Sequence, residues 1–287
     1  MLNEKKMRLT PTKRPEHIVI RKPEWTFSDL KGKKPKSLFG RLMFGSLSLL
    51  FPDGERFFIR SVKHFADQIS NPQLREDVKA FIGQETQHGK LHEIFNRAIL
   101  GENLDIDTFL THYRKYAFDW LEVRAGSILG PKLALSVTAA AEHFTATWAA
   151  QSLSDDYLDR SVTNQELRDL MKWHAVEEIE HKHVAFDVLQ EIDDSYPLRA
   201  AGMVMTGMLL PVAISAAFVS LLAQSKDFNF IEYTRDFFVE AKDGHIMKTF
   251  LPSLIKYFKP GFHPSDNDDY ELASSIVREI ESRMLAA

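Results

Sequence analysis

Two copies of the motif Glu-x-x-His constrain the fold more than any other feature of the sequence. They span Glu85–His88 and Glu178–His181, and each lies in a long segment whose apolar residues recur at helical spacing. Residues three apart lie on one face of a helix, so each motif points a carboxylate and an imidazole in the same direction. One such pair is half of a metal site, which predicts two helices that meet along these faces. An overlapping third pair, Glu180 and His183, is turned away and is predicted to lie at the surface.

Two further glutamates complete the pattern. Glu55 lies 30 residues before Glu85, and Glu142 lies 36 residues before Glu178, each in apolar helical surroundings. Four antiparallel helices, with one long connection between the second and the third, would bring the side chains of all four glutamates and both motif histidines to the centre of a bundle. We therefore predict an all-α protein, a four-helix bundle with additional C-terminal helices.

Proline, glycine and capping residues divide the chain into helices, and no stretch shows the sustained alternation that is typical of strands. Proline suits the first turn of a helix, and glycine suits the residue after the last turn. The predicted helices of the bundle region cover residues 52–69, 72–100, 105–124, 131–153 and 164–193.

We interpret the chain as a single domain in three parts: a basic arm at residues 1–51, the helical bundle at 52–192 and a helical elaboration at 193–287. Residues 1–41 contain twelve Lys or Arg and four acids, a charge of +8, whereas the whole chain carries −4. The arm is interpreted as packing on the acidic body of the protein, with contact to an anionic membrane surface as the alternative. Nucleic acid is not expected as a partner, because the arm has no interleaved aromatic residues and no recognised nucleic-acid motif.

The absence of cysteine limits the chemistry. The chain has no thiol for a disulfide, a zinc finger, an iron–sulfur cluster or a nucleophile, so a metal must bind to His, Asp or Glu. Four buried carboxylates would repel one another and lose their hydration, whereas two divalent cations would offset their charge. An oxygen-rich donor set suits iron or manganese. We predict two Fe ions, with Mn/Fe, Mn or Zn as alternatives.

A histidine one turn before the second motif extends it to His174-x-x-x-Glu178-x-x-His181. The motif order resembles that of the ferritin-like dimetal-carboxylate superfamily. The extended motif looks like that of the diiron arylamine N-oxygenases, whose site carries an additional histidine. Over residues 15–285 the chain is also similar to the bacterial family of predicted metal-dependent hydrolases. Together these resemblances imply seven metal ligands: Glu55, Glu85, His88, Glu142, His174, Glu178 and His181.

Two residues beside the motifs have several open roles. His92 follows His88 by four positions and continues its face, so it is a polar residue near solvent, an outer partner of a ligand, a proton relay or a ligand. Glu177 competes with Glu178, because it lies four residues before His181. The Glu-x-x-His match favours Glu178 and leaves Glu177 as a candidate outer partner.

The segment Ala200–Ala223 contains 24 residues without a charge, which is long enough to cross a bilayer as a helix. Pro211, near its middle, would kink or end such a helix. The sequence favours two short buried helices or a dimer contact over a lipid-facing element or a membrane span. The first forty residues show no secretory signal, so we expect a cytoplasmic protein, peripheral to or embedded in the inner membrane if this segment meets lipid.

These observations favour an enzyme. The main hypothesis is a non-haem dimetal oxygenase or oxidase, which uses dioxygen and an unidentified electron donor to oxidise a small or lipid-like molecule. The chemistry would take place at the metals, and we expect a homodimer. The alternative is a metal-dependent hydrolase that uses a dimetal-bound water. A second alternative is a metal-handling or structural helical protein without enzymatic activity.

Overall fold

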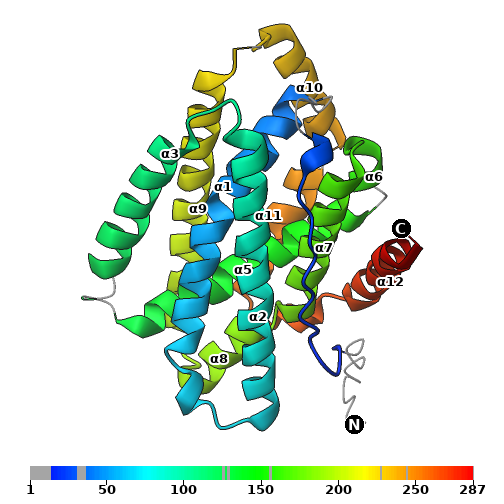
Figure 1. Cartoon of the computed structure of the whole chain (residues 1–287). Helices are drawn as coiled ribbons and strands as arrows, with labels where there is room; N and C mark the ends of the chain where they lie inside the picture. Colours follow the sequence, from blue (N-terminus) through cyan, green and yellow to red (C-terminus); the bar gives the residue numbers. More distant parts are fainter. Residues whose placement is uncertain are drawn as a thin grey trace, which may run out of the picture.

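The computed structural model of the chain describes residues 14–30, 37–124, 127, 130–154, 157–226, 228–243 and 245–286. Within these ranges every regular element is a helix, so the predicted all-α class is confirmed. Figure 1 shows long helices running side by side, with shorter helices across one end and one side.

Four helices form the bundle that positions the site: α1 (Leu38–Lys63), α2 (Pro72–Phe95), α5 (Pro131–Leu153) and α7 (Gln165–His181). Helix α1 packs against α2 and α5, and α5 packs against α7. Local sequence sets two of their starts. The Asn71 side chain accepts hydrogen bonds from Gln73 and Leu74 at the start of α2, and the Asn164 side chain accepts one from Leu167 at the start of α7.

Helix α1 begins at Leu38, so the predicted start at residue 52 is wrong, and the boundary drawn at residue 51 falls inside a helix. Pro52 lies in the interior of α1, where it cannot donate a hydrogen bond to the carbonyl of Ser48 one turn earlier. That carbonyl instead accepts a hydrogen bond from the side chain of Asn96, 2.7 Å away on the neighbouring polypeptide segment. A partner from outside the helix therefore compensates for the missing bond.

The long connection between the second and third bundle helices is itself helical. A π-helical turn, η3 (Asn96–Leu100), continues from α2, and α3 (Ile106–Tyr113) is followed by a second π-helical segment, η4 (Arg114–Glu122). The predicted helix at residues 105–124 corresponds to α3 and η4. In Figure 1 α3 lies to one side of α1, where it contacts α9.

The predicted helix at residues 164–193 is divided in two. Helix α7 ends at His181, and α8 (Val184–Ile192) begins after a turn at Lys182 and His183. Lys182 and His183 keep right-handed helical backbone angles, and Val184, Val188 and Leu189 of α8 are fully buried in the main apolar core.

Helix α9 (Tyr196–Gln224) is continuous, so the expectation of two short buried helices is wrong. Pro211 is exposed inside it, and Gly207 one turn earlier is exposed too, so water can satisfy the carbonyl that Pro211 leaves free. One face of α9 packs closely on α5, where a side chain at Gly202 would collide with Ser136. Of the described helices, α9 alone is long and apolar enough to cross a membrane, yet only 17% of its most apolar window is buried.

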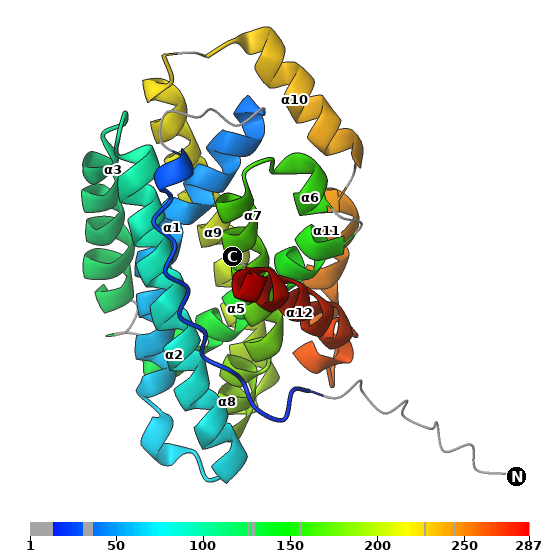
Figure 2. The same ribbon diagram turned by 45° about the vertical axis from the view of Figure 1, so that its right-hand side comes forward.

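The C-terminal helices cover the other side of the bundle. Helix α11 (His245–Tyr257) packs on α5, and α12 (Tyr270–Ala286) packs on α7. Helix α10 (Phe230–Asp243) crosses one end of the molecule (Figure 2). The short elements are α6 (Tyr157–Ser161) and the 3₁₀ turns η1 (Ser28–Leu30), η2 (Ala66–Gln68) and η6 (Pro264–Asp266).

Residues 14–27 form an extended N-terminal strap that runs along the bundle (Figure 2). Ile18 is buried in the main core, and Ile20 packs against Gly83 of α2, where a Cβ atom would come within 2.3 Å of the Ile20 side chain. This part of the basic arm therefore lies on the protein body, as predicted. Much of the arm's charge lies outside the described residues: Lys5, Lys6, Arg8, Lys13, Lys31, Lys33, Lys34 and Lys36.

Candidate metal centre

The four glutamates of the sequence pattern meet inside the bundle, one from each long helix. Glu55 comes from α1, Glu85 from α2, Glu142 from α5 and Glu178 from α7. None is more than 5% exposed. Three buried histidines join them: His88, His174 and His181. The structure thus brings together all seven residues that the sequence singled out as metal ligands.

Glu85 and Glu178 lie between the histidines. Glu85 Oε1 is 3.1 Å from His181 Nε2 and 3.7 Å from His88 Nδ1. Glu178 Oε1 is 2.9 Å from His174 Nε2, and Glu178 Oε2 is 3.6 Å from His181 Nε2. Each of these two carboxylates therefore lies close to two histidines, Glu85 to His88 and His181 and Glu178 to His174 and His181.

The ligand atoms separate into two groups, each able to hold one ion. Glu55, His88 and His174 offer atoms within 4.8 Å of one another, and so do Glu85, Glu178 and His181. Glu142 extends the second group, because its Oε2 atom is 3.2 Å from His181 Nε2. Each half thus offers both oxygen and nitrogen donors.

Most of the buried oxygen and nitrogen atoms of this cluster lack hydrogen-bond partners, as expected for the ligands of a metal. Both carboxylate oxygens of Glu55, Glu85 and Glu142 are buried without a hydrogen bond of normal geometry, and so are His88 Nδ1 and His181 Nε2. Buried polar groups normally have hydrogen-bond partners, because leaving them unpaired costs about 1–3 kcal/mol each. Unpaired donors that converge on one interior region match a set of metal ligands.

Burial shapes the charges of this cluster. It raises the pKa of Glu55 well above the ordinary value, and the neighbouring Glu85 raises it further. Burial also raises the pKa of Glu142, to about 8. Burial lowers the pKa of His88, but the carboxylates of Glu177 and Glu85 outweigh it and raise that pKa well above normal. The raised pKa values favour the protonated forms of Glu55, Glu142 and His88. A bound divalent cation would displace these protons.

Each histidine of the cluster has its second ring nitrogen engaged outside it. His88 Nε2 donates to Glu177 Oε2 at 3.1 Å, and His181 Nδ1 donates to Gln84 Oε1 at 2.9 Å. His174 Nδ1 is 2.7 Å from His92 Nε2. Such outer partners orient metal-binding imidazoles and select their tautomer. The remaining nitrogens, His88 Nδ1, His174 Nε2 and His181 Nε2, face the glutamates.

The N-terminal strap holds these outer partners in place. Arg21 donates to Glu177 Oε1 at 3.2 Å and forms two hydrogen bonds with Glu180, at 2.8 and 2.9 Å. Glu177 also accepts a hydrogen bond from Trp173 Nε1 at 2.9 Å. Gln84 Nε2 donates to the backbone carbonyl of Val19 and to Glu180 Oε2, both at 3.0 Å. A strap from the other end of the sequence therefore helps to orient His88 and His181.

The structure also shows where the residues beside the motifs lie, which tests the roles that the sequence left open for them. Glu177 bonds to His88 and lies outside the cluster, as expected for an outer partner. His92 bonds to His174 and is 1% exposed, so its interpretation as a residue near solvent is wrong. Glu180 and His183 do face away from the cluster, but the predicted surface position is wrong for His183, which is buried beside Asp77.

Gly89 of α2 leaves room for the carboxylate of Glu55. A Cβ atom at this position would lie 3.1 Å from Glu55 Oε2, tighter than ordinary van der Waals contact. Thr145 of α5 donates a hydrogen bond to Glu178 Oε2.

Aromatic rings enclose the cluster: Phe51 packs on His174, Trp173 on His88 and Phe81 on His181, with centroids 4.7–5.0 Å apart. These rings keep water away from the donor atoms.

Comparison with protein families agrees with this geometry. The family model for predicted metal-dependent hydrolases matches residues 23–268, which is most of the chain. The chain belongs to this family. Neither the curated proteins nor the solved structures contain a significant match.

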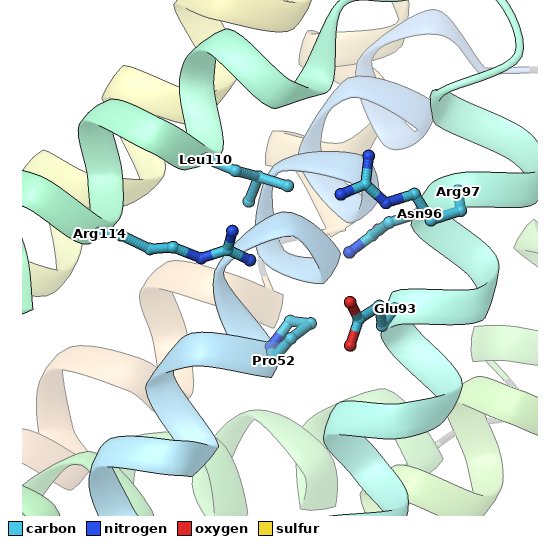
Figure 3. A pocket seen from close by; sticks show the side chains of 6 residues that line it. All are labelled: Pro52, Glu93, Asn96, Arg97, Leu110 and Arg114. Carbon is cyan, nitrogen blue, oxygen red and sulfur yellow. The ribbon is translucent and has the colours of Figure 1, made fainter.

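In this member of the family of predicted metal-dependent hydrolases, a pocket lies at the outer side of α1. It is lined by residues of α1, α2, η3, α3 and η4: Pro52, Glu93, Asn96, Arg97, Leu110 and Arg114. Their side chains point toward one another across the space between the helices (Figure 3). Pro52 lies one turn before Glu55, so the pocket borders the helix that carries a cluster carboxylate.

Sequence reasoning missed Arg21, Gln84, Ser48 and Asn96, which support the histidines of this family member. Gln84 directly precedes the first motif, but nothing in its spacing predicts its bond to His181, 97 residues away. Arg21 acts across 156 residues and appears in the sequence as one charge among twelve in the basic arm. No local pattern carries such long-range contacts.

Proposed function

We propose that the chain is an enzyme whose bundle centre binds two divalent metal ions. Glu55, His88 and His174 would hold one ion, and Glu142 and His181 the other. Glu85 and Glu178 would bridge the two, since each lies within reach of histidines from both groups. The observation that carries this proposal is the set of buried, unpaired donor atoms from four helices.

The donor set favours iron and an oxidative reaction on a small or lipid-like molecule. Carboxylates outnumber imidazoles four to three, and no soft sulfur ligand is available in the sequence. Iron would supply electrons for the reduction of dioxygen, whereas a redox-inert ion such as Zn²⁺ would activate water for hydrolysis. Membership of the ferritin-like superfamily is part of this proposal, supported by the order Glu, Glu-x-x-His, Glu, Glu-x-x-His on four bundle helices.

The side chains of this protein would contribute positioning and the exclusion of water. Outer partners on all three histidines hold their ring planes and direct one nitrogen of each inward. The hydroxyl of Thr145 holds one oxygen of Glu178 and leaves the other to face His174. The rings of Phe51, Phe81 and Trp173 make the interior apolar, which strengthens electrostatic interactions at the centre.

A metal-dependent hydrolase is the second candidate, and the comparisons favour it over the oxidative reaction. The family description names hydrolysis, and it covers residues 23–268. The same ligands suit it, because two ions about 3.5–4 Å apart are also the usual arrangement for water activation in phosphatases and nucleases. The metal's redox activity therefore separates the two candidates.

The deciding experiment compares redox and hydrolytic activity in one preparation. Purified chain is loaded anaerobically with Fe²⁺, analysed for metal content and then exposed to oxygen while oxygen uptake and the optical spectrum are followed. Two ions per chain with oxygen uptake support the oxygenase. Two ions without oxygen uptake, together with cleavage of chromogenic esters or phosphoesters by the Zn²⁺ or Mn²⁺ form without oxygen, overturn the oxygenase in favour of the hydrolase.

A matched pair of variants makes this result specific to the centre. Glu85→Ala removes a proposed bridge and should abolish both metal loading and activity, whereas Lys79→Met on the exposed face of the same helix should change neither. Wild-type chain that folds but binds no metal at all overturns both enzymatic proposals. That result would favour a structural role.

A further inference from the structure

A chain of four buried polar side chains leads from the pocket to the metal centre. Asn96 Oδ1 is 2.6 Å from Ser48 Oγ, and Ser48 Oγ is 2.9 Å from His92 Nδ1. His92 Nε2 is in turn 2.7 Å from His174 Nδ1, whose other nitrogen faces Glu178 at 2.9 Å. Asn96, Ser48, His92 and His174 are each no more than 6% exposed. The proposed ligands do not include the first three.

The direction of this hydrogen-bond chain is determined at its outer end. The Asn96 amide nitrogen donates to the backbone carbonyl of Ser48 at 2.7 Å, and a carbonyl can only accept. That carbonyl is available because Pro52, one turn later in α1, has no N–H to donate to it. The amide orientation of Asn96 is therefore set, and its oxygen must face the hydroxyl of Ser48.

Each following bond then has one possible direction. The single hydroxyl proton of Ser48 goes to Asn96 Oδ1, so Ser48 Oγ must accept from His92 Nδ1–H. A neutral His92 then presents a lone pair at Nε2, which can only accept from His174 Nδ1–H. His174 is left with a lone pair at Nε2, the atom that faces Glu178. This is the tautomer that a metal ligand requires.

His174 needs such a chain more than the other two histidines do. His88 donates to a carboxylate and His181 donates to an amide oxygen, so both have outer partners that only accept. The partner of His174 is another imidazole, which can present either a proton or a lone pair. Only the polar groups beyond His92 decide which of the two it presents.

The contact between His174 Nε2 and Glu178 Oε1 agrees with this assignment. Two lone-pair atoms 2.9 Å apart would repel each other, but they suit two neighbouring ligands of one ion. Ligands that lie about 2.1 Å from an ion at right angles to each other are about 3 Å apart. This distance is compatible with two ligands of one cation, but an N–H···O hydrogen bond has the same length, so the tautomer is assigned from the hydrogen bonds beyond His92 and not from this distance.

We propose that Asn96, Ser48 and His92 are positioning residues that hold His174 in the tautomer needed to bind metal through Nε2. The proposal rests on the dimetal centre of the proposed function. It assigns His92 as an outer partner and excludes it as a ligand, since both of its ring nitrogens are engaged elsewhere. It also excludes a proton relay through these groups, because the amide of Asn96 does not exchange a proton with the pocket at ordinary pH.

Two variants of His92 distinguish the effect of losing the hydrogen-bond acceptor for His174 from the effect of losing the aromatic ring. His92→Phe keeps a ring between Phe44 and Phe51 but removes the acceptor for His174. His92→Gln keeps an amide oxygen that can accept from His174 and an amide nitrogen that can donate to Ser48. Fe²⁺ affinity is measured anaerobically by competition with a chelator, with metal content per folded chain from elemental analysis. We expect His92→Phe to bind one of its two ions about 10–100-fold more weakly, with most of this loss restored in His92→Gln.

Ser48→Ala tests the outer part of the chain without touching either histidine. It removes the acceptor for His92 Nδ1–H, so His92 should change tautomer and the same ion should be weakened as in His92→Phe. Unchanged binding in Ser48→Ala alongside weak binding in His92→Phe would show that Ser48 does not set the tautomer of His92 and would overturn the proposal. So would unchanged binding in both variants while the wild type binds two ions.

A spectroscopic readout observes the tautomer directly and does not require activity. In chain labelled with ¹⁵N-histidine and loaded with diamagnetic Zn²⁺, long-range proton–nitrogen spectra distinguish Nδ1–H from Nε2–H, and the His92 signals are identified by their absence in His92→Phe. We expect His92 as Nδ1–H. Detection of His92 as Nε2–H would overturn the inference even where the dimetal centre is confirmed. A wild-type chain that binds no second ion would overturn the dimetal centre and this inference together.

Discussion

Helices α7 and α9 reverse the usual relation between polarity and burial. Helix α7 contains five acids, two histidines, an arginine and a lysine, yet eleven of its 17 residues are buried, including Lys172, Glu177 and Glu178. Helix α9 has no charge between residues 200 and 223, yet only 17% of its most apolar window is buried. From composition alone, α9 would be expected to be buried and α7 to be exposed.

The difference shows where the molecule departs from the arrangement that stability alone would favour. Buried charges are stable only when they are paired, and those of α7 are paired with the strap, with histidines or, for Lys172, with Asp159 of α6. A large exposed apolar face is equally unfavourable in water and marks a contact surface. We therefore propose that the buried face of α7 serves the metal centre, and we expect the exposed face of α9 to be a contact surface.

The largest expected effect concerns the proposed bridges of the buried centre. Glu178→Ala should weaken binding of both ions by about 100-fold or more, because it removes a ligand from each half. Glu55→Ala, which removes a ligand from one half, should weaken only one ion. Anaerobic titration with Fe²⁺ measures both affinities. Equal losses in the two variants would contradict the division into bridging and terminal carboxylates.

Removal of the metal ions should lower the free energy of unfolding. An ion present at 100 times its dissociation constant stabilises the folded state by about 2.7 kcal/mol. For a chain of 287 residues that corresponds to a loss of about 4–5 °C in melting temperature per ion after chelation. Thermal denaturation with and without chelator measures the shift. Glu178→Ala should show almost no shift, and a wild-type chain that is insensitive to chelator would refute metal binding at the centre.

The strap gives the next effect in size. Arg21→Met leaves the carboxylate of Glu177 buried with less positive charge nearby, so we expect a loss of about 3 kcal/mol in the free energy of unfolding and weaker metal binding. Lys79→Met breaks a pair whose side chains are 71% and 66% exposed, and it should cost less than about 1 kcal/mol. Denaturant titration compares the two variants. Similar losses would show that the strap contact is an ordinary surface pair.

The smallest effect on folding, and the sharpest on association, is expected on α9. Met208 and Val212 are 58% and 66% exposed on its outer face. A Met208→Lys, Val212→Lys variant should fold as well as the wild type but shift from an associated form toward the monomer in light scattering. A change of charge at an exposed polar position outside this face, Glu102→Lys, serves as the control. A monomeric wild type that floats with lipid vesicles would assign the α9 face to a membrane instead.

The sequence was sufficient for the all-α class and for the residues that converge in the centre. Helical spacing is a local property, so Glu85 and His88 could be placed on one face without knowledge of the rest of the chain. The convergence of four helices was predicted from the order of Glu55, Glu142 and the two motifs along the chain and from the topology of an antiparallel bundle.

The remaining features depend on contacts that no local pattern contains. The partners of His92 lie 44 and 82 residues away, and those of Arg21 lie 156 and 159 residues away. The start of α1 was misplaced because proline at position 52 is a local signal for a first turn, whereas its tolerance inside the helix depends on Asn96. The exposure of α9 depends on which surfaces the bundle leaves uncovered.

Pro52 also limits how the protein can be stabilised. Replacing an interior proline normally strengthens a helix by up to about 3 kcal/mol. In α1 the new N–H at position 52 would compete for the Ser48 carbonyl, which now orients the amide of Asn96. A more regular helix would thus come at the expense of the side-chain order behind His174, and an engineer who optimised the backbone alone would weaken the centre that the bundle encloses.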